Sequence, residues 1–171
     1  MPALEKNTSL DALIARYNLR PHAEGGWYAE TYRSAGTIAQ SALPPGFNGP
    51  RAYSTAIMYL LGPSDKSALH RIRQDEVWHF YLGGPLELAQ ISPRGEPARV
   101  RLGQDLAAGQ AVQCVVPAGS WFGARPMPGA DFCLAGCTVA PGFEFADFEA
   151  ADPDALTAEF PHLAGVIAEF T

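Results

Sequence analysis

The chain has 171 residues, 47% of them hydrophobic and 18% charged, and its formal net charge is −6. These values indicate one globular domain with a sizeable core, and they argue against a nucleic-acid partner because no basic run is present. They also argue against a membrane protein, since the longest apolar stretches, such as residues 54–62 (STAIMYLLG), are too short to cross a bilayer.

The first expected element is a helix that begins after Ser9. The Ser9 side chain can cap it, Asp11 falls in its first turn, and its apolar stripe comprises Leu10, Leu13, Ile14 and Tyr17. The start of the chain lacks the apolar core of a signal peptide, so we expect a cytoplasmic protein. The Gly25–Gly26 pair then indicates a sharp turn or a close approach of two backbones.

Short runs rich in aromatic and β-branched residues follow, and Gly and Pro separate them. The expected strands are residues 27–33, 52–61, 67–72, 76–82, 85–92, 98–103, 111–117, 120–126 and 131–141. This spacing without intervening helices predicts a β-sandwich or a β-barrel. The insertion at residues 34–50 is loop-like and long enough to be a lid or an interface arm.

Helix is expected again at the C-terminal end of the chain. Asp152 can cap it, Pro153 suits the first helical position, and Pro161 ends it. The chain also has three cysteines, and this odd number argues against a disulfide framework. Cys133 and Cys137 fall in one expected strand about 13 Å apart, too far for a disulfide. We therefore expect the cysteines to be small buried apolar residues.

The segment at residues 69–84 (LHRIRQDEVWHFYLGG) holds most of the candidate chemistry. Side chains alternate between the faces of a strand. His70 and Glu76 can therefore both point into a barrel. In the strand at 76–82 the inward set would be Glu76, Trp78, Phe80 and Leu82, and the outward set would be Val77, His79 and Tyr81.

The same segment resembles the first motif of the cupins, which is His, any residue, His, three or four residues, Glu, six residues, Gly. His70, Glu76 and Gly83 follow that spacing, but Ile72 stands where the second His belongs. Residues 109–122 (GQAVQCVVPAGSWF) are similar to the second motif, which ends in Pro-x-Gly, two residues, His. There the chain has seven residues between Gly and Pro in place of five, and Phe122 replaces the His.

Three longer blocks are similar to one cupin branch of unknown function. They are residues 22–34 (HAEGGWYAETYRS), 69–81 and 134–149 (LAGCTVAPGFEFADFE), and the resemblance extends over about residues 9–162. It implies an all-β fold: a single cupin domain over residues 1–171, a jelly-roll or double-stranded β-helix barrel with its core at about 24–148 and short helices at both ends. It also implies a homodimer. It implies no particular reaction, because different cupins have many unrelated functions.

The resemblance leaves three functions open. The first is a cupin that binds a small molecule and has no cofactor. Such a cupin could be an isomerase or epimerase of a carbohydrate-like or heterocyclic metabolite. His70 would be the base, Glu76 would orient it, and Tyr59 or Tyr81 would be the acid. The second is a metal-dependent enzyme, which would need His70, Glu76 and His79 as ligands of a divalent metal. We disfavour it because two motif ligands are replaced. The third is a non-catalytic binding or storage module.

Aromatic side chains are the candidates for ligand contact. Trp78, Phe80, Phe122 and His79 could offer flat surfaces to a small planar or sugar-like ligand, although ordinary packing would explain them as well. For Glu24 and Arg33 the simpler interpretation is an exposed strand with solvated charges, and the alternative is the mouth of a barrel.

Overall fold

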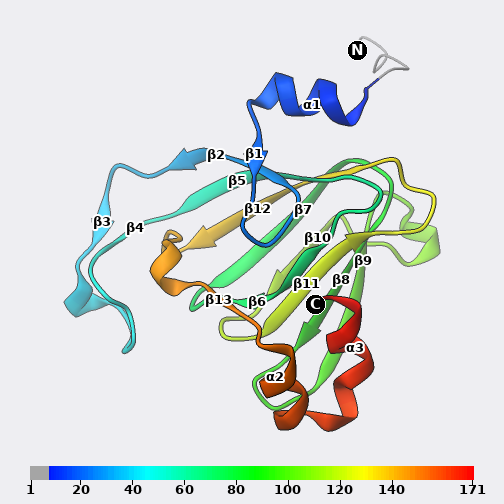
Figure 1. Ribbon diagram of the computed structural model, residues 1–171. Coiled ribbons are helices and arrows are strands. Elements are labelled where there is room, and N and C mark those ends of the chain that lie inside the picture. The colour runs from blue at the N-terminus through cyan, green and yellow to red at the C-terminus, as the bar shows by residue number, and fades with distance from the viewer. Residues whose placement is uncertain (1–7) are drawn as a thin grey trace.

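The computed structural model describes residues 8–171, and most of their strands form two facing antiparallel sheets (Figure 1). The six-stranded sheet has, in spatial order, β1 (Arg20–Pro21), β2 (Trp27–Arg33), β5 (Thr55–Leu61), β12 (Cys133–Ala140), β7 (Asp75–Gly83) and β10 (Gln113–Val116). The five-stranded sheet has β13 (Glu149–Ala150), β6 (Ser67–Arg71), β11 (Trp121–Pro126), β8 (Leu86–Ile91) and β9 (Pro97–Leu102). The expected all-β barrel is confirmed, with strand ends within a few residues of those predicted.

Alternation along each strand supplies the core between the sheets. Cys133 and Cys137 of β12 point inward beside Leu86 and Leu88 of β8, while Leu134 points outward. The cysteines are free. Inward apolar side chains on both sheets exclude water from the interior, which stabilises the pair of sheets.

Short helices cover the outer faces. The helix α1 (Leu10–Tyr17) is capped by Ser9 as predicted, with the Ala12 amide donating to Ser9 Oγ at 3.2 Å, and it packs on Leu60 and Leu134 of the six-stranded sheet. The helices α2 (Pro153–Glu159) and α3 (Ala164–Glu169) cover the five-stranded sheet (Figure 1). Asp152 caps α2 through the amides of residues 154 and 155. None of the described helices is both long and apolar enough to cross a membrane.

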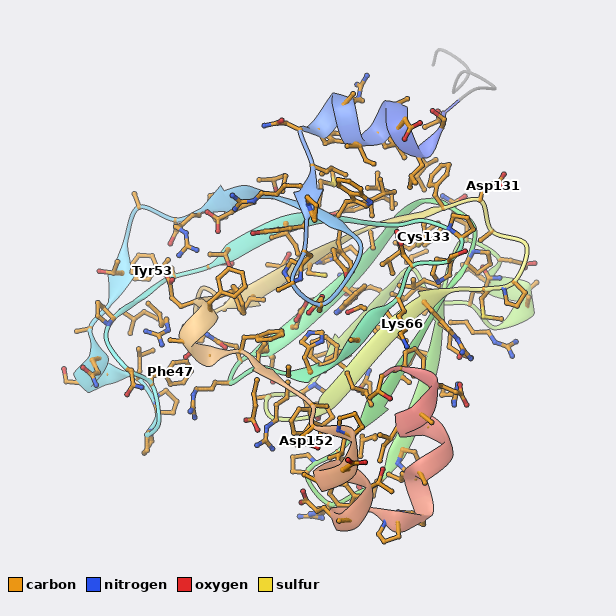
Figure 2. The ribbon with its side chains drawn as sticks, viewed as in Figure 1. Phe47, Tyr53, Lys66, Asp131, Cys133 and Asp152 are labelled. Carbon is orange, nitrogen blue, oxygen red and sulfur yellow. The ribbon has the colours of Figure 1, made fainter. Side chains whose placement is uncertain are left out.

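The predicted insertion at residues 34–50 forms an arm. It contains β3 (Thr37–Ile38) and the 3₁₀ turn η1 (Gln40–Ala42). The strand β4 (Arg51–Ala52) follows directly, pairs with β3 and completes the arm. Figure 2 shows Phe47 and Tyr53 on this arm, on the opposite side of the view from Cys133. Lys66 lies near the C-terminal helix in the same view and contacts the carbonyl of Thr171.

Two β-bulges change the faces that alternation predicts. Where β7 pairs with β12, Tyr81 has no partner residue on β12. As a result Leu82 packs in the outer cluster under α1, and not on the inner face with Phe80. In β2 the register with β5 skips Thr31. A bulge adds one residue to one strand and reverses the parity of everything after it. The expectation that Leu82 points inward is therefore wrong.

Candidate active site

A cavity of about 310 Å³ lies between the two sheets and the segment 143–148. This segment leaves β12 in one sheet and leads to β13 in the other, with the 3₁₀ turn η3 (Phe145–Asp147) within it (Figure 1). Its aromatic side chains Phe143, Phe145 and Phe148 line the cavity, together with Tyr28 of β2. The volume is at the small end of ligand sites, so the cavity suits a small metabolite.

The inner end of the cavity carries buried acid and base groups. They are His22, Glu24, His70, Glu76 and Cys137, which come from the turn before β2 and from β6, β7 and β12. A few converging polar groups beside apolar and aromatic walls are the usual composition of an active or binding site.

A tight turn between β1 and β2 positions His22 and Glu24. The Gly25 amide donates to the His22 carbonyl at 3.1 Å, the His22 amide donates to the Gly26 carbonyl at 2.9 Å, and Gly25 has a φ of 111°. The Ala68 amide of β6 donates to the Glu24 carbonyl at 2.9 Å. A Cβ on Gly25 would lie 2.1 Å from the Lys66 carbonyl oxygen, so only glycine allows this approach. The turn and the close approach expected of Gly25–Gly26 are confirmed.

His70 has no free ring nitrogen. Its Nδ1 lies 2.8 Å from the Ala68 carbonyl oxygen and its Nε2 lies 2.9 Å from Glu24 Oε2. Two acceptors facing both nitrogens are satisfied by an imidazolium, which donates from both. Burial opposes this charge, but Glu24 outweighs it and raises the pKa of His70. The expected arrangement, in which Glu76 orients His70 and leaves one nitrogen free as a base, is therefore wrong, because Glu24 occupies Nε2.

Glu24 completes this ion pair. Burial favours its neutral form, but the facing His70 more than offsets that effect and keeps the pKa of Glu24 below its ordinary value. Its Oε1 also accepts a hydrogen bond from Ser67 Oγ at 3.0 Å. The Glu24–His70 pair is thus a fixed carboxylate–imidazolium pair.

Glu76 is the group whose proton is most easily moved near neutral pH. Burial is the largest cause that raises the pKa of Glu76 to about 7, with Glu24 also raising it and His70 lowering it. Burial also raises the pKa of the neighbouring Cys137 thiol, so this cysteine stays protonated and is a poor nucleophile. Both side chains line the cavity.

His22 is a neutral imidazole of defined tautomer. Its Nδ1 accepts a hydrogen bond from the Glu24 amide at 3.2 Å, which places the ring proton on Nε2. Burial is the main cause that lowers the pKa of His22; Glu24 opposes it, and the nearby His70 and Arg20 act in the same direction as burial. No hydrogen bond within the described residues uses its Nε2, and the His22 ring packs edge-on against Tyr28, with 4.5 Å between ring centroids.

The mouth of the cavity carries exposed charges. Arg33 binds Glu30 at 2.8 Å and Glu144 at 2.7 Å, and all three side chains line the cavity. The bulge at Thr31 puts Glu30 and Arg33 on the same side of β2, although they are three residues apart. Arg33 lies at this mouth, which was the less simple of the two interpretations. Glu24 is buried at the inner end, so the expectation of a solvated charge is wrong for Glu24.

The structure places the expected acids away from the cavity. The Tyr59 hydroxyl donates to the Gly25 carbonyl at 2.6 Å and is buried in the core, and burial raises its pKa well above the ordinary value. Tyr81 lies on the outer face of β7, where its ring stacks on His79. Neither hydroxyl lines the cavity, so neither expectation is supported.

The expected ligand contacts also lie outside the cavity lining. Trp78 and Phe122 are fully buried and Phe80 packs beside them in the core between the sheets. Phe122 contacts the site through His70, because its ring packs on the His70 ring with 4.1 Å between the ring centroids. His79 lies on the outer face, as alternation predicts, and bonds to Thr138 and Gln113.

The residues present do not fit a divalent metal. His70 already has both nitrogens engaged, and Ile72 and Phe122 stand where the motifs would supply further histidines. His79 faces away from the cavity. Within residues 8–171 no group of three or more His, Cys, Asp or Glu side chains is arranged to hold a metal ion.

Sequence reasoning missed much of the site. It did not select His22, Tyr28, Cys137 or the aromatic segment 143–148 as site residues. The signal that could have found the first is the order His22, Glu24, Gly25, Gly26, which places two ionisable groups directly before a constrained turn. No local pattern shows that segment 143–148 crosses between the sheets.

Comparison with known proteins shows the family of this chain. A family model described as "Cupin superfamily (DUF985)" matches residues 11–151. The chain belongs to this cupin family. An uncharacterized protein of Saccharomyces cerevisiae, YML079W, is 30% identical to this cupin over 155 residues, which are 86% of this chain and 77% of the yeast protein.

Solved structures show the same fold. A hypothetical protein from Leishmania major has a TM-score of 0.86 at 31% identity, covering 95% of this cupin and 98% of that chain. Protein SO0799 from Shewanella oneidensis has a TM-score of 0.85 at 37% identity, covering 96% and 98%. Oxalate decarboxylase from Bacillus subtilis has a TM-score of 0.53 at 13% identity, covering 88% of this cupin and 36% of that chain, and this likeness concerns the fold alone.

Proposed function

We propose that this cupin is a metal-independent isomerase that moves a proton on a small carbonyl-containing metabolite, such as a carbohydrate-like or heterocyclic compound. The observation that carries the proposal is the placement of Glu76 and a neutral His22 at the inner end of one small cavity, beside the fixed Glu24–His70 pair. Homodimer formation and cytoplasmic location remain predictions.

Glu76 is the proposed base. As a carboxylate it takes a proton from the hydroxyl-bearing carbon next to the substrate carbonyl, which gives an enediolate. As a carboxylic acid it returns that proton to the former carbonyl carbon, while the hydroxyl proton passes to the former carbonyl oxygen, so that the carbonyl and the hydroxyl exchange places. A carboxyl group with a pKa of about 7 can do both at neutral pH. Because one carboxyl group carries the proton both ways, the transfer suits one face of the substrate.

His22 is the proposed electrophile. Its Nε2–H would donate to the carbonyl oxygen, which becomes negative when the carbon loses its proton. A neutral imidazole beside a carboxylate base is a known solution for this chemistry, with the imidazole pKa held low so that it stays neutral. Burial gives His22 that property here.

The Glu24–His70 pair is proposed to position the site. Its imidazolium faces Glu76 and limits how far burial raises the pKa of that carboxyl group. Its carboxylate lies beside His22, whose Nδ1 is 3.7 Å from Glu24 Oε1. His70 is therefore a positioning residue and not the base.

The test is proton exchange in heavy water. The protein is incubated with a panel of ketose and aldose phosphates, 2-oxo acids and sugar acids, and deuterium entering carbon positions is followed by NMR. We expect exchange with at least one compound, a loss of about 100-fold or more in Glu76→Gln, and an unchanged rate in His79→Gln, which alters a histidine on the outer face.

The alternative is the non-catalytic binding module. Compounds that raise the melting temperature of the protein but never acquire deuterium would contradict proton transfer and support that alternative. Equal exchange rates in the native protein and Glu76→Gln would contradict the role of Glu76.

A further inference from the structure

The mouth of the cavity contains one arginine, Arg20, that has no ion-pair partner among the described residues. Arg20, on β1, lines the cavity and is exposed. Among the described residues no carboxylate lies within ion-pair distance of its guanidinium, whereas Arg33 is held by two. Since the protein has a net charge of −6, an anion would need a local cation of this kind to bind.

The backbone fixes where this cation lies. Arg20 pairs with Tyr28 across β1 and β2, and its guanidinium lies 4.9 Å from the centroid of the Tyr28 ring. Tyr28 is itself a wall of the cavity and contacts His22. The stacked ring holds the guanidinium over the wall and leaves its edge donors free, which is the arrangement that favours carboxylate or phosphate binding.

Without Arg20 the mouth carries one net negative charge, because it holds two carboxylates, Glu30 and Glu144, and one arginine, Arg33. Both carboxylates accept hydrogen bonds from Arg33, which also donates to the Phe143 carbonyl at 3.2 Å. Arg20 brings the mouth to neutrality, and its guanidinium donors are not engaged by these carboxylates, so they can bind the acid group of a ligand directly. The other end offers donors, from His22 Nε2–H and from the Glu76 carboxyl group in its acid form.

We infer that the cavity takes a small organic anion, with its acid group on Arg20 at the mouth, its apolar or aromatic body against Tyr28 and Phe148, and a carbonyl or hydroxyl oxygen at the His22–Glu76 end. The assignment of the oxygen rests on the proposed function, whereas the assignment of the acid group rests on Arg20 alone. A carboxylate and a phosphate share the required chemistry.

Binding of matched neutral and anionic probes tests this inference. Phenylpyruvate is compared with its methyl ester, and ribose 5-phosphate with ribose, by isothermal titration calorimetry on the full chain. We expect the anion of at least one pair to bind about tenfold or more tightly than its neutral partner. The pair that discriminates more strongly identifies carboxylate or phosphate as the acid group.

Variants assign the effect to Arg20. Arg20→Gln should remove the discrimination and Arg20→Lys should keep part of it, while Arg16→Gln, which alters an exposed arginine on α1 outside the cavity lining, should leave it unchanged. Equal binding of the two members of both pairs, no binding by any probe, or unchanged discrimination in Arg20→Gln would overturn the inference.

The measurement is repeated in Glu76→Gln so that the two proposals can fail separately. Discrimination should persist in this variant, because the acid group is bound by Arg20, which Glu76→Gln leaves in place. If discrimination is present while no compound exchanges deuterium, the anion site stands and the proposed isomerase fails. If exchange occurs but discrimination is absent, the isomerase stands and the role of Arg20 fails.

Discussion

At the scale of single residues, different surroundings give different pKa values to two carboxyl groups of the same chemical type. Glu24 forms an ion pair with an imidazolium and stays ionised, whereas Glu76 is buried without an ion pair among the described residues and has a pKa of about 7. Two carboxyl groups with pKa values pushed apart are a recurring way to assign different roles in one site. Here the roles are a fixed anion and a proton carrier.

The raised pKa of Glu76 predicts how stability depends on pH. The folded protein keeps the proton to about pH 7 and the unfolded chain releases it near 4.5, so the contribution of Glu76 to stability is fully present below pH 4.5. It is lost as the pH rises to about 7, and the loss amounts to about 3 kcal/mol. The groups that face Glu76 are His70, Glu24 and Cys137.

Urea unfolding at pH 5, 6, 7 and 8 measures this loss. The free energy of unfolding of the native protein, minus that of Glu76→Gln, should fall by about 2–3 kcal/mol from pH 5 to pH 8. Because Glu24 and His70 remain in both proteins, most of their own titration cancels. Parallel curves for the two proteins would show that Glu76 has an ordinary pKa.

At the scale of elements, one turn and one bulge assemble the site. The turn at Gly25–Gly26 carries His22 and Glu24 to β6, and the bulge at Thr31 turns Arg33 toward the mouth. Neither feature contributes much apolar burial. Both depend on backbone geometry, so glycine at the turn is more restricted than its small side chain suggests.

Replacing Gly25 tests the turn against a matched glycine. Gly25→Ala should lower the free energy of unfolding by about 2–4 kcal/mol, because the new methyl group meets the Lys66 carbonyl and φ is positive. Gly109 also has a positive φ, of 76°, but nothing lies within 4 Å of a Cβ there. Gly109→Ala should therefore cost only about 1 kcal/mol, as measured by urea unfolding. Equal losses of unfolding free energy in the two variants would mean that backbone strain at positive φ, and not the contact with the Lys66 carbonyl, sets the cost of Gly25→Ala.

At the scale of the whole molecule, a buried ion pair joins segments that are distant in the chain. Arg51 of β4 donates to both oxygens of Asp147 at 2.7 Å, and Gln74 donates to Asp147 at 2.7 Å. These bonds hold the arm, the turn between β6 and β7, and segment 143–148 together. Since that segment forms one wall of the cavity, the pair supports the shape of the site from outside it.

Breaking this pair should be costly. Asp147→Asn leaves the buried Arg51 without its counter-charge and should lower the free energy of unfolding by about 3–5 kcal/mol. Glu149→Gln is the matched control two residues along, because Glu149 binds Arg71 in an exposed pair, and its loss should cost less than about 1 kcal/mol. Similar losses in the two variants would contradict a structural role for the buried pair.

The sequence by itself determined the barrel, its terminal helices and the inward direction of His70 and Glu76. These follow from alternation, capping residues and motif spacing, which are local along the chain. Only the tertiary structure decided that Glu24 is the partner of His70, that Tyr59 and Tyr81 lie away from the cavity, and that segment 143–148 closes it. Those contacts depend on strand register, two bulges and the crossing between sheets, and packing between distant residues sets all of these.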